Sequence, residues 1–154
     1  MVEIQIPDQF ADIVAVNQLR EDKRMIVLAS RAMLTKLEAC ETIFADGTFK
    51  TCPRMFRQVY ILRGEDSEGY RHNLLFALMP DRSAESYRWL FRQIKTRVME
   101  VTSGEFKPKI VMTDFEEAVI AAIRQELPQT LNKGCYFHFV KAFFRKLASL
   151  GLTV

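Results

Sequence analysis

Apolar and polar segments alternate along the chain, and the first of them predict a strand followed by a helix. Residues 25–29 form a short, β-branched apolar run between charged neighbours, which is typical of a buried strand. Ser30 can cap a helix over residues 31–40, because its hydroxyl can accept a hydrogen bond from an unpaired amide of the first turn. Within that segment Leu34 and Leu37 recur at helical spacing.

The next segments predict three strands, two of which form a hairpin. Residues 42–45 are strand-like and end at Asp46 and Gly47, a dipeptide that is common in turns. Residues 56–63 and 70–79 are also strand-like, and a short stretch rich in glycine and acidic residues separates them. We therefore expect these two strands to pair in an antiparallel hairpin.

A long amphipathic helix is predicted after Ser83, which is its candidate N-cap. The helix is expected to end at Ser103 and Gly104, where helical periodicity stops. Its apolar side chains recur every three or four residues and form a single stripe that should face the core. The stripe comprises Tyr87, Leu90, Phe91, Ile94, Val98 and Val101.

The remaining pattern predicts a buried strand and a second helix. Residues 110–112 are apolar and bounded by polar residues, so they should form a central strand that ends at Asp114. The helix after it should end at Pro128, because proline has no amide hydrogen to donate. Its expected apolar face comprises Phe115, Val119, Ala122 and Ile123.

A further strand is predicted over residues 134–139, followed by a last helix with Gly151 as its C-cap. The apolar side of that helix should face the core and comprises Val140, Phe143, Phe144, Leu147 and Leu150. From Thr42 onward the order is three strands and then alternating helices and strands. The pattern thus predicts an α/β fold with a mixed sheet flanked by helices.

Composition agrees with one globular domain. The chain has 154 residues, of which 49% are hydrophobic and 27% charged, so disordered and coiled-coil classes are excluded. The net charge of +3 permits a polyanionic partner without requiring one. No apolar run approaches the ~20 residues of a membrane helix. With three cysteines, an odd number, we expect reduced thiols in a soluble intracellular protein without a membrane partner.

Asp46 and Asp114 are the candidate site residues, because each follows a predicted strand. Acidic groups at the ends of neighbouring strands could share a divalent cation, and carboxylate oxygens suit Mg²⁺ or Mn²⁺. Two simpler interpretations remain open. Asp46 could belong to a turn, and Asp114 could cap a helix, since Thr113 and Glu116 have the spacing of a capping box.

Several motifs together resemble the catalytic domain of Mutator-like element (MULE) transposases. FADGTFK at residues 44–50 and FRQVY at 56–60 resemble the start of that domain. YRWLF at 87–91, IVMTDFE at 110–116 and KGCYFHF at 133–139 follow in the family's order and approximate spacing. The segment before them resembles the family's lead-in, so the similarity covers nearly the whole chain.

The resemblance implies a ribonuclease H-like fold with a DDE-type active site, in which Asp46 and Asp114 match the first two aspartates. It also implies Mg²⁺ or Mn²⁺ as the cofactor and DNA strand cleavage and transfer as the reaction. The implied partners are DNA, as transposon ends and target, and a full-length transposase as a possible homo-oligomer. The implied location is the nucleus.

The family has a third acidic residue, a glutamate on a helix beyond a Cys-x-x-His motif that Cys135 and His138 match here. No residue of this chain matches that glutamate. Glu116 and Glu117 lie too close in sequence to the second aspartate. We therefore expect residues 1–40 to form a lead-in strand and helix packed on the core, and residues 41–154 a C-terminally incomplete core. Activity stays open: the alternatives are an enzyme core inactive alone, a decayed or domesticated remnant that binds DNA or protein, and an unstable fragment without function.

Cys135 and His138 form the Cys-x-x-His motif. Zinc usually needs four ligands, and Cys40, Cys52 and His72 show no partner spacing, so zinc is not expected. Residues three apart on a strand also face opposite sides. Structural packing is the first interpretation, and the resemblance offers DNA or active-site positioning as the alternative.

Two groups of basic residues could contact a phosphate backbone if the aspartates hold a cation. One group follows Asp46 and the other lies on the last predicted helix, where Lys146 shares the same basic face. A solvated surface is the simpler interpretation of both groups. The candidate DNA-binding residues are Lys50, Arg54, Arg57, Lys141 and Arg145.

Overall fold

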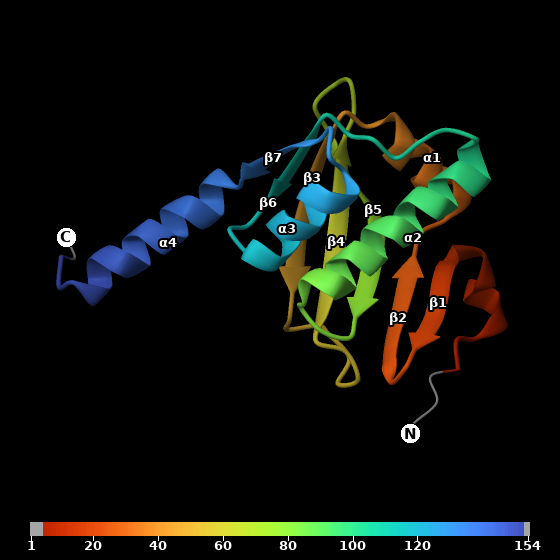
Figure 1. The fold of residues 1–154 in the computed structure, drawn as a ribbon, viewed down its shortest axis with the longest axis horizontal. Coiled ribbons are helices and arrows are strands. Elements are labelled where there is room, and N and C mark those ends of the chain that lie inside the picture. Colours follow the sequence, from red (N-terminus) through yellow and green to blue (C-terminus); the bar gives the residue numbers. More distant parts are fainter. Residues whose placement is uncertain (1–4, 153–154) are drawn as a thin grey trace.

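The computed structural model describes residues 5–152, which form a seven-stranded mixed sheet flanked by helices (Figure 1). The elements are the 3-10 helix η1 (Asp8–Ile13), β1 (Val14–Arg20), β2 (Lys23–Leu28), α1 (Arg31–Ala39), β3 (Thr42–Thr48), β4 (Gln58–Glu65), β5 (Arg71–Met79), α2 (Ala84–Thr102), β6 (Ile110–Thr113), α3 (Glu117–Glu126), β7 (Leu131–Gly134) and α4 (Tyr136–Ser149). The predicted α/β class and the predicted order of elements from Thr42 are confirmed.

The strand order in the sheet is β1-β2-β5-β4-β3-β6-β7. The first four neighbouring pairs are antiparallel, including the predicted β4–β5 hairpin, whereas β3–β6 and β6–β7 are parallel. The hairpin turn is closed by Asp66, whose carboxylate accepts hydrogen bonds from the amides of Glu68 and Tyr70. Parallel pairing of β3 with β6 requires a crossover, and the long helix α2 lies within it.

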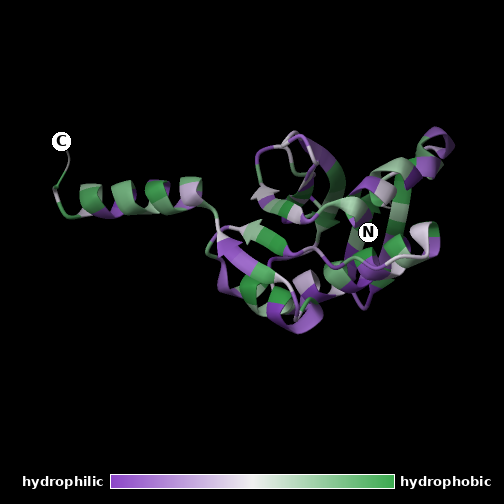
Figure 2. Ribbon diagram, turned by 90° about the horizontal axis from the view of Figure 1, so that it is seen from above, coloured by the Kyte–Doolittle hydropathy of each residue, from purple (hydrophilic) through white to green (hydrophobic). Residues whose placement is uncertain are grey.

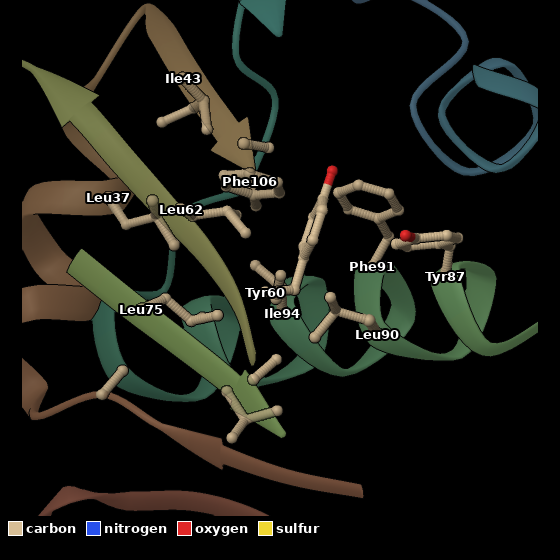
Figure 3. Close-up of a cluster of buried hydrophobic side chains, with 14 of the residues drawn as sticks. Leu37, Ile43, Tyr60, Leu62, Leu75, Tyr87, Leu90, Phe91, Ile94 and Phe106 are labelled. Atoms are coloured by element: carbon tan, nitrogen blue, oxygen red, sulfur yellow. The ribbon is translucent and has the colours of Figure 1, made fainter. Parts of the chain in front are cut away.

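Helices α1, α2 and α3 gather on one face of the sheet, with α2 in contact with the other two (Figure 1). The predicted stripe of α2 is buried except for Val101, which is partly buried at the edge of the core. Figure 3 shows Leu90, Phe91 and Ile94 of this helix beside residues of β4 and β5. Both predicted caps are confirmed, since the hydroxyls of Ser30 and Ser83 accept first-turn amide hydrogens.

Strand β3 is longer than the sequence predicted, so the turn interpretation of Asp46 and Gly47 is wrong. Asp46 pairs with Ile61 and Gly47 pairs with Tyr60 inside the β3–β4 ladder. Glycine is required here for a close approach. A Cβ atom at position 47 would clash with the side-chain oxygen of Gln58, which occupies the space above Gly47.

The predicted strand over residues 134–139 is also wrong. β7 ends at Gly134, where it pairs with Thr113 of β6, and the amide of Cys135 then donates to the Thr113 carbonyl at 2.7 Å. The amide of Phe139 donates to the Cys135 carbonyl, which opens α4. Tyr136, Phe137 and Phe139, which lie in the predicted strand, therefore belong to the first turns of a helix.

α4 does not pack its apolar side on the core, contrary to expectation. Figures 1 and 2 show the helix extending away from the sheet, and none of its described side chains is buried. Phe143, Phe144 and Leu150 are 52%, 61% and 59% exposed, because the chain leaves the sheet at β7 and does not turn back over it. Gly151 does cap the helix, with a φ of 71° and its amide bonded to the Ala148 carbonyl.

Two smaller differences concern the ends of the core. Phe115 precedes α3 and is exposed, with its ring against Gly134, whereas Val119, Ala122 and Ile123 are buried as predicted. η1 and β1 were not predicted.

Within residues 5–152, the structure contains no helix with the length and apolar character needed to span a membrane.

Candidate cation site beside strands β3 and β6

The two candidate aspartates lie on neighbouring parallel strands. Phe44 of β3 pairs with Met112 of β6 in the last pair of the parallel ladder. Asp46 lies two residues further along β3, and Asp114 is the first residue after β6, so the two lie at the same end of neighbouring strands. Both carboxylates are partly exposed. The parallel pairing thus meets the condition that the two strands are neighbours, on which a shared cation depends.

His138 reaches the same place from the first turn of α4. Its Nε2 atom lies 3.7 Å from the Oδ1 atom of Asp46. Its Nδ1 atom is buried and makes no hydrogen bond within the described residues. Cys135, three residues earlier, is the N-cap residue of the helix, and positions three apart on a helix share a side. The argument that Cys135 and His138 face opposite sides needed a strand over residues 134–139, and that condition is not met.

Glu116 is hydrogen-bonded to Asp114, which the spacing of the two residues in the sequence did not indicate. Its amide donates to Oδ1 of Asp114 at 3.1 Å, and its Oε2 atom accepts from Arg82 at 2.8 Å and from the Tyr87 hydroxyl at 3.1 Å. The predicted capping box is wrong, since Glu116 itself is the N-cap of α3 and the Thr113 hydroxyl donates to the Asp114 carbonyl instead.

Tyr60 of β4 projects to the face of the sheet opposite to the Asp46 side chain, because Tyr60 pairs with Gly47 and Asp46 pairs with Ile61. Its side chain is only 3% exposed, and its hydroxyl makes no hydrogen bond within the described residues. Its ring meets that of Tyr87 edge-on at 5.1 Å, and Figure 3 shows its hydroxyl pointing away from the aliphatic cluster. Burial raises the pKa of Tyr60 well above its ordinary value, and the nearby Tyr87, Asp114, Glu116 and Asp46 raise it further.

A model of the MULE transposase domain family matches residues 42–142, which extend from β3 into α4. The chain belongs to the MULE transposase domain family. A search of curated proteins found no match. Membership of this family indicates a transposase-related function and interaction with DNA in general. The matched range includes both aspartates, Cys135 and His138.

The donor atoms of this MULE domain fit a hard divalent cation. Mg²⁺ and similar ions are often held by one or two carboxylates and complete their shells with water, and Asp46 and Asp114 would supply such a pair if both reached one ion. Within the described part of the chain, no three or more His, Cys, Asp or Glu side chains are arranged to hold a metal by themselves. A bound cation would therefore take the rest of its ligands from water or substrate.

The candidate basic residues fall into two separate places. Lys50, Arg54 and Arg57 lie in the exposed segment between β3 and β4, which begins at the end of the strand that carries Asp46. Lys141 and Arg145 are exposed on α4. None of these five forms an ion pair with another residue in the range 5–152, so their charges face solvent.

Proposed function

We propose that this MULE domain binds Mg²⁺ or Mn²⁺ through Asp46 and Asp114 and is the cation-binding part of a DNA strand-cleavage and transfer site. The observation that carries the proposal is the parallel pairing of β3 with β6, which supports it because Asp46 and Asp114 lie at the same end of these neighbouring strands. When bound, such a cation activates an attacking oxygen and neutralises charge on a phosphodiester.

The sheet topology supports a ribonuclease H-like core. β5, β4 and β3 form an antiparallel meander, and β6 and β7 continue the sheet parallel to β3. In open α/β sheets, ligand sites lie beyond the carboxyl ends of the parallel strands. Asp114 directly follows β6, and Asp46 lies near the end of β3, so both occupy that position.

The surrounding residues have separate roles in this proposal. His138 contacts Asp46, and the amide of Glu116 holds Asp114, so both carboxylates are oriented by neighbours. The exposed segment after β3 carries Lys50, Arg54 and Arg57, and in this proposal they contact phosphates without reading sequence. The site as described supplies two acidic ligands, and we expect weak or no strand transfer by this chain alone.

Calorimetric titration of the full 154-residue chain with Mn²⁺ tests the proposal. Asp46→Asn and Asp114→Asn should each weaken binding by at least about tenfold, because each removes one charged ligand. Asp22→Asn is the matched control, since Asp22 is an exposed aspartate in the β1–β2 turn and should leave binding unchanged. Equal Mn²⁺ affinity in wild type and both site variants would disprove the assignment.

A second candidate function is binding of DNA or protein without catalysis. The aromatic and basic side chains of α4 favour this function, because none of the described side chains of this helix is buried. In that case DNA affinity should depend on Lys141 and Arg145 and should not respond to Mn²⁺ or to Asp46→Asn. DNA affinity measured with and without Mn²⁺ in Asp46→Asn, Lys141→Ala and Arg145→Ala therefore distinguishes the two functions.

A further inference from the structure

Arg82 contacts both of the chain segments that follow the candidate aspartates. Its guanidinium carbon lies 5.0 Å from the centre of the Phe49 ring, and Phe49 is the first residue after β3. Its Nη2 atom donates to Oε2 of Glu116 at 2.8 Å. Phe49 follows Asp46 by three residues. Glu116 follows Asp114 by two residues. One side chain therefore joins two segments that are remote in sequence.

The two contacts use different properties of the guanidinium group. A cation over an aromatic face is attracted to it within about 6 Å of the ring centre. The bond to Glu116 joins opposite charges, so it is stronger than a hydrogen bond between neutral groups. Arginine combines a planar face with several fixed donors, whereas lysine has a compact charge on a flexible stem. Lysine at position 82 would keep the charge but could not reproduce both contacts.

The backbone around Arg82 is anchored to the rest of the fold. The Asp81 carboxylate accepts hydrogen bonds from the amide and the hydroxyl of Ser83 at 2.9 and 2.7 Å. The same carboxylate pairs with Lys23 of β2 at 2.8 Å. Ser83 is the N-cap of α2, whose apolar stripe is packed in the core. The side chain of Arg82 therefore reaches the two segments from an anchored point.

Glu116 connects this bridge to Asp114. Its carboxylate accepts a second hydrogen bond from the Tyr87 hydroxyl at 3.1 Å, so two donors hold it. Its amide donates to Oδ1 of Asp114 at 3.1 Å. Groups that are hydrogen-bonded to a metal ligand orient that ligand and alter metal affinity. A displaced Glu116 would therefore change the orientation of the Asp114 carboxylate.

We infer that Arg82 is a positioning residue of the Asp46–Asp114 site, where it joins the segments after β3 and β6 and so constrains the separation of the two aspartates. This inference rests on the proposed function, because it needs a cation at the two aspartates. Arg82 has donors only and a positive charge, so it acts through Phe49 and Glu116 and is not a ligand of the cation.

Mn²⁺ titration of the full chain tests the inference in Arg82→Lys and Phe49→Leu. The first variant keeps the charge, and the second keeps the apolar bulk. Each should weaken Mn²⁺ binding about three- to tenfold, which is less than the typical effect of changing a group bonded directly to a metal ligand. The double variant should lose little more than either single variant, because both changes break one bridge.

Two further variants separate positioning from a general effect on the fold. Phe49→Tyr keeps the aromatic face, so it should retain most of the affinity that Phe49→Leu loses. Arg97→Lys is the matched control, because Arg97 also belongs to an ion pair, with Glu100 at 2.6 Å, on the surface of α2. Without metal, Arg82→Lys and Phe49→Leu should melt within about 2 °C of wild type, because the two side chains are 40% and 50% exposed.

The outcomes separate this inference from the proposed function. Weaker Mn²⁺ binding in Arg82→Lys and Phe49→Leu, with recovery in Phe49→Tyr and unchanged melting, supports it. Unchanged affinity in Arg82→Lys, with affinity lost in Asp46→Asn, overturns the inference alone. A clearly lower metal-free melting temperature in Arg82→Lys assigns the bridge to folding and also overturns it. Absence of Mn²⁺ binding by wild type overturns both proposals.

Discussion

At the residue scale, the dipeptide of Asp46 and Gly47 has a role in a strand that its composition does not indicate. Asp-Gly is typical of turns, yet both residues lie inside β3. The glycine makes room for the buried side chain of Gln58, whose amide group donates to Tyr87. This requirement depends on a neighbouring strand and a distant helix, so the local sequence could not disclose it.

Gly47→Ala should destabilise the protein by about 1–3 kcal/mol, because the added methyl group must displace a buried, hydrogen-bonded side chain. Gly104→Ala is the matched control. Its methyl group would meet the end of the Glu38 side chain, which can move aside, and would lie 3.2 Å from the Thr102 hydroxyl oxygen. Urea denaturation of both variants measures the difference, and equal free energies of unfolding would contradict the explanation.

Asp81 gives a pH-dependent prediction at the same scale. Burial alone would raise the pKa of its carboxyl, but hydrogen bonds from Lys23, Ser86 and Ser83 outweigh burial and hold the pKa well below 3.8. A lowered folded-state pKa means that the charged form stabilises the fold above the unfolded-state pKa, and that this stabilisation is lost as the pH falls below it.

Asp81→Asn should therefore lower the free energy of unfolding by about 1–2 kcal/mol at neutral pH, the typical contribution of a hydrogen bond to a charged group that is partly exposed. The difference between wild type and variant should shrink as the pH falls below about 3.8. Chemical denaturation at several pH values measures it. A difference that stays constant into the acid range would contradict the assigned role of the charge.

At the scale of elements, periodicity predicted the segments that bury one face against their neighbours. α2 and the β4–β5 hairpin agree with their patterns because each has a continuous apolar side and a recognisable cap or turn. α4 has an equally clear apolar side, but the described chain does not cover it. Periodicity indicates that a helix is amphipathic and does not indicate what it contacts.

Phe91→Ala should cost about 3–5 kcal/mol, because the ring is fully buried in the core. Phe143→Ala on α4 should cost less than about 0.5 kcal/mol, because its ring is 52% exposed. Denaturant unfolding of the two variants compares the same substitution in two environments. A large loss of stability in Phe143→Ala would mean that α4 is packed against a surface.

At the scale of the whole molecule, the sequence predicted the two aspartates but not their neighbours. Their motifs were recognisable, but the pairing of β3 with β6 was only a condition in the sequence analysis and was established by the structure. Glu116 joins Asp114 to Arg82 and Tyr87 through hydrogen bonds between distant segments, which its spacing from Asp114 did not indicate. His138 was recognised as part of a motif, but its contact with Asp46 depends on where α4 begins.

The central claim is that Asp46 and Asp114 hold one cation between them, and Mn²⁺ stoichiometry in the single and double asparagine variants tests it most directly. A shared cation predicts one Mn²⁺ per wild-type chain, loss of that ion in either single variant, and little further loss in the double variant. Two ions per chain, with each single variant losing one and the double variant losing both, would contradict a shared site.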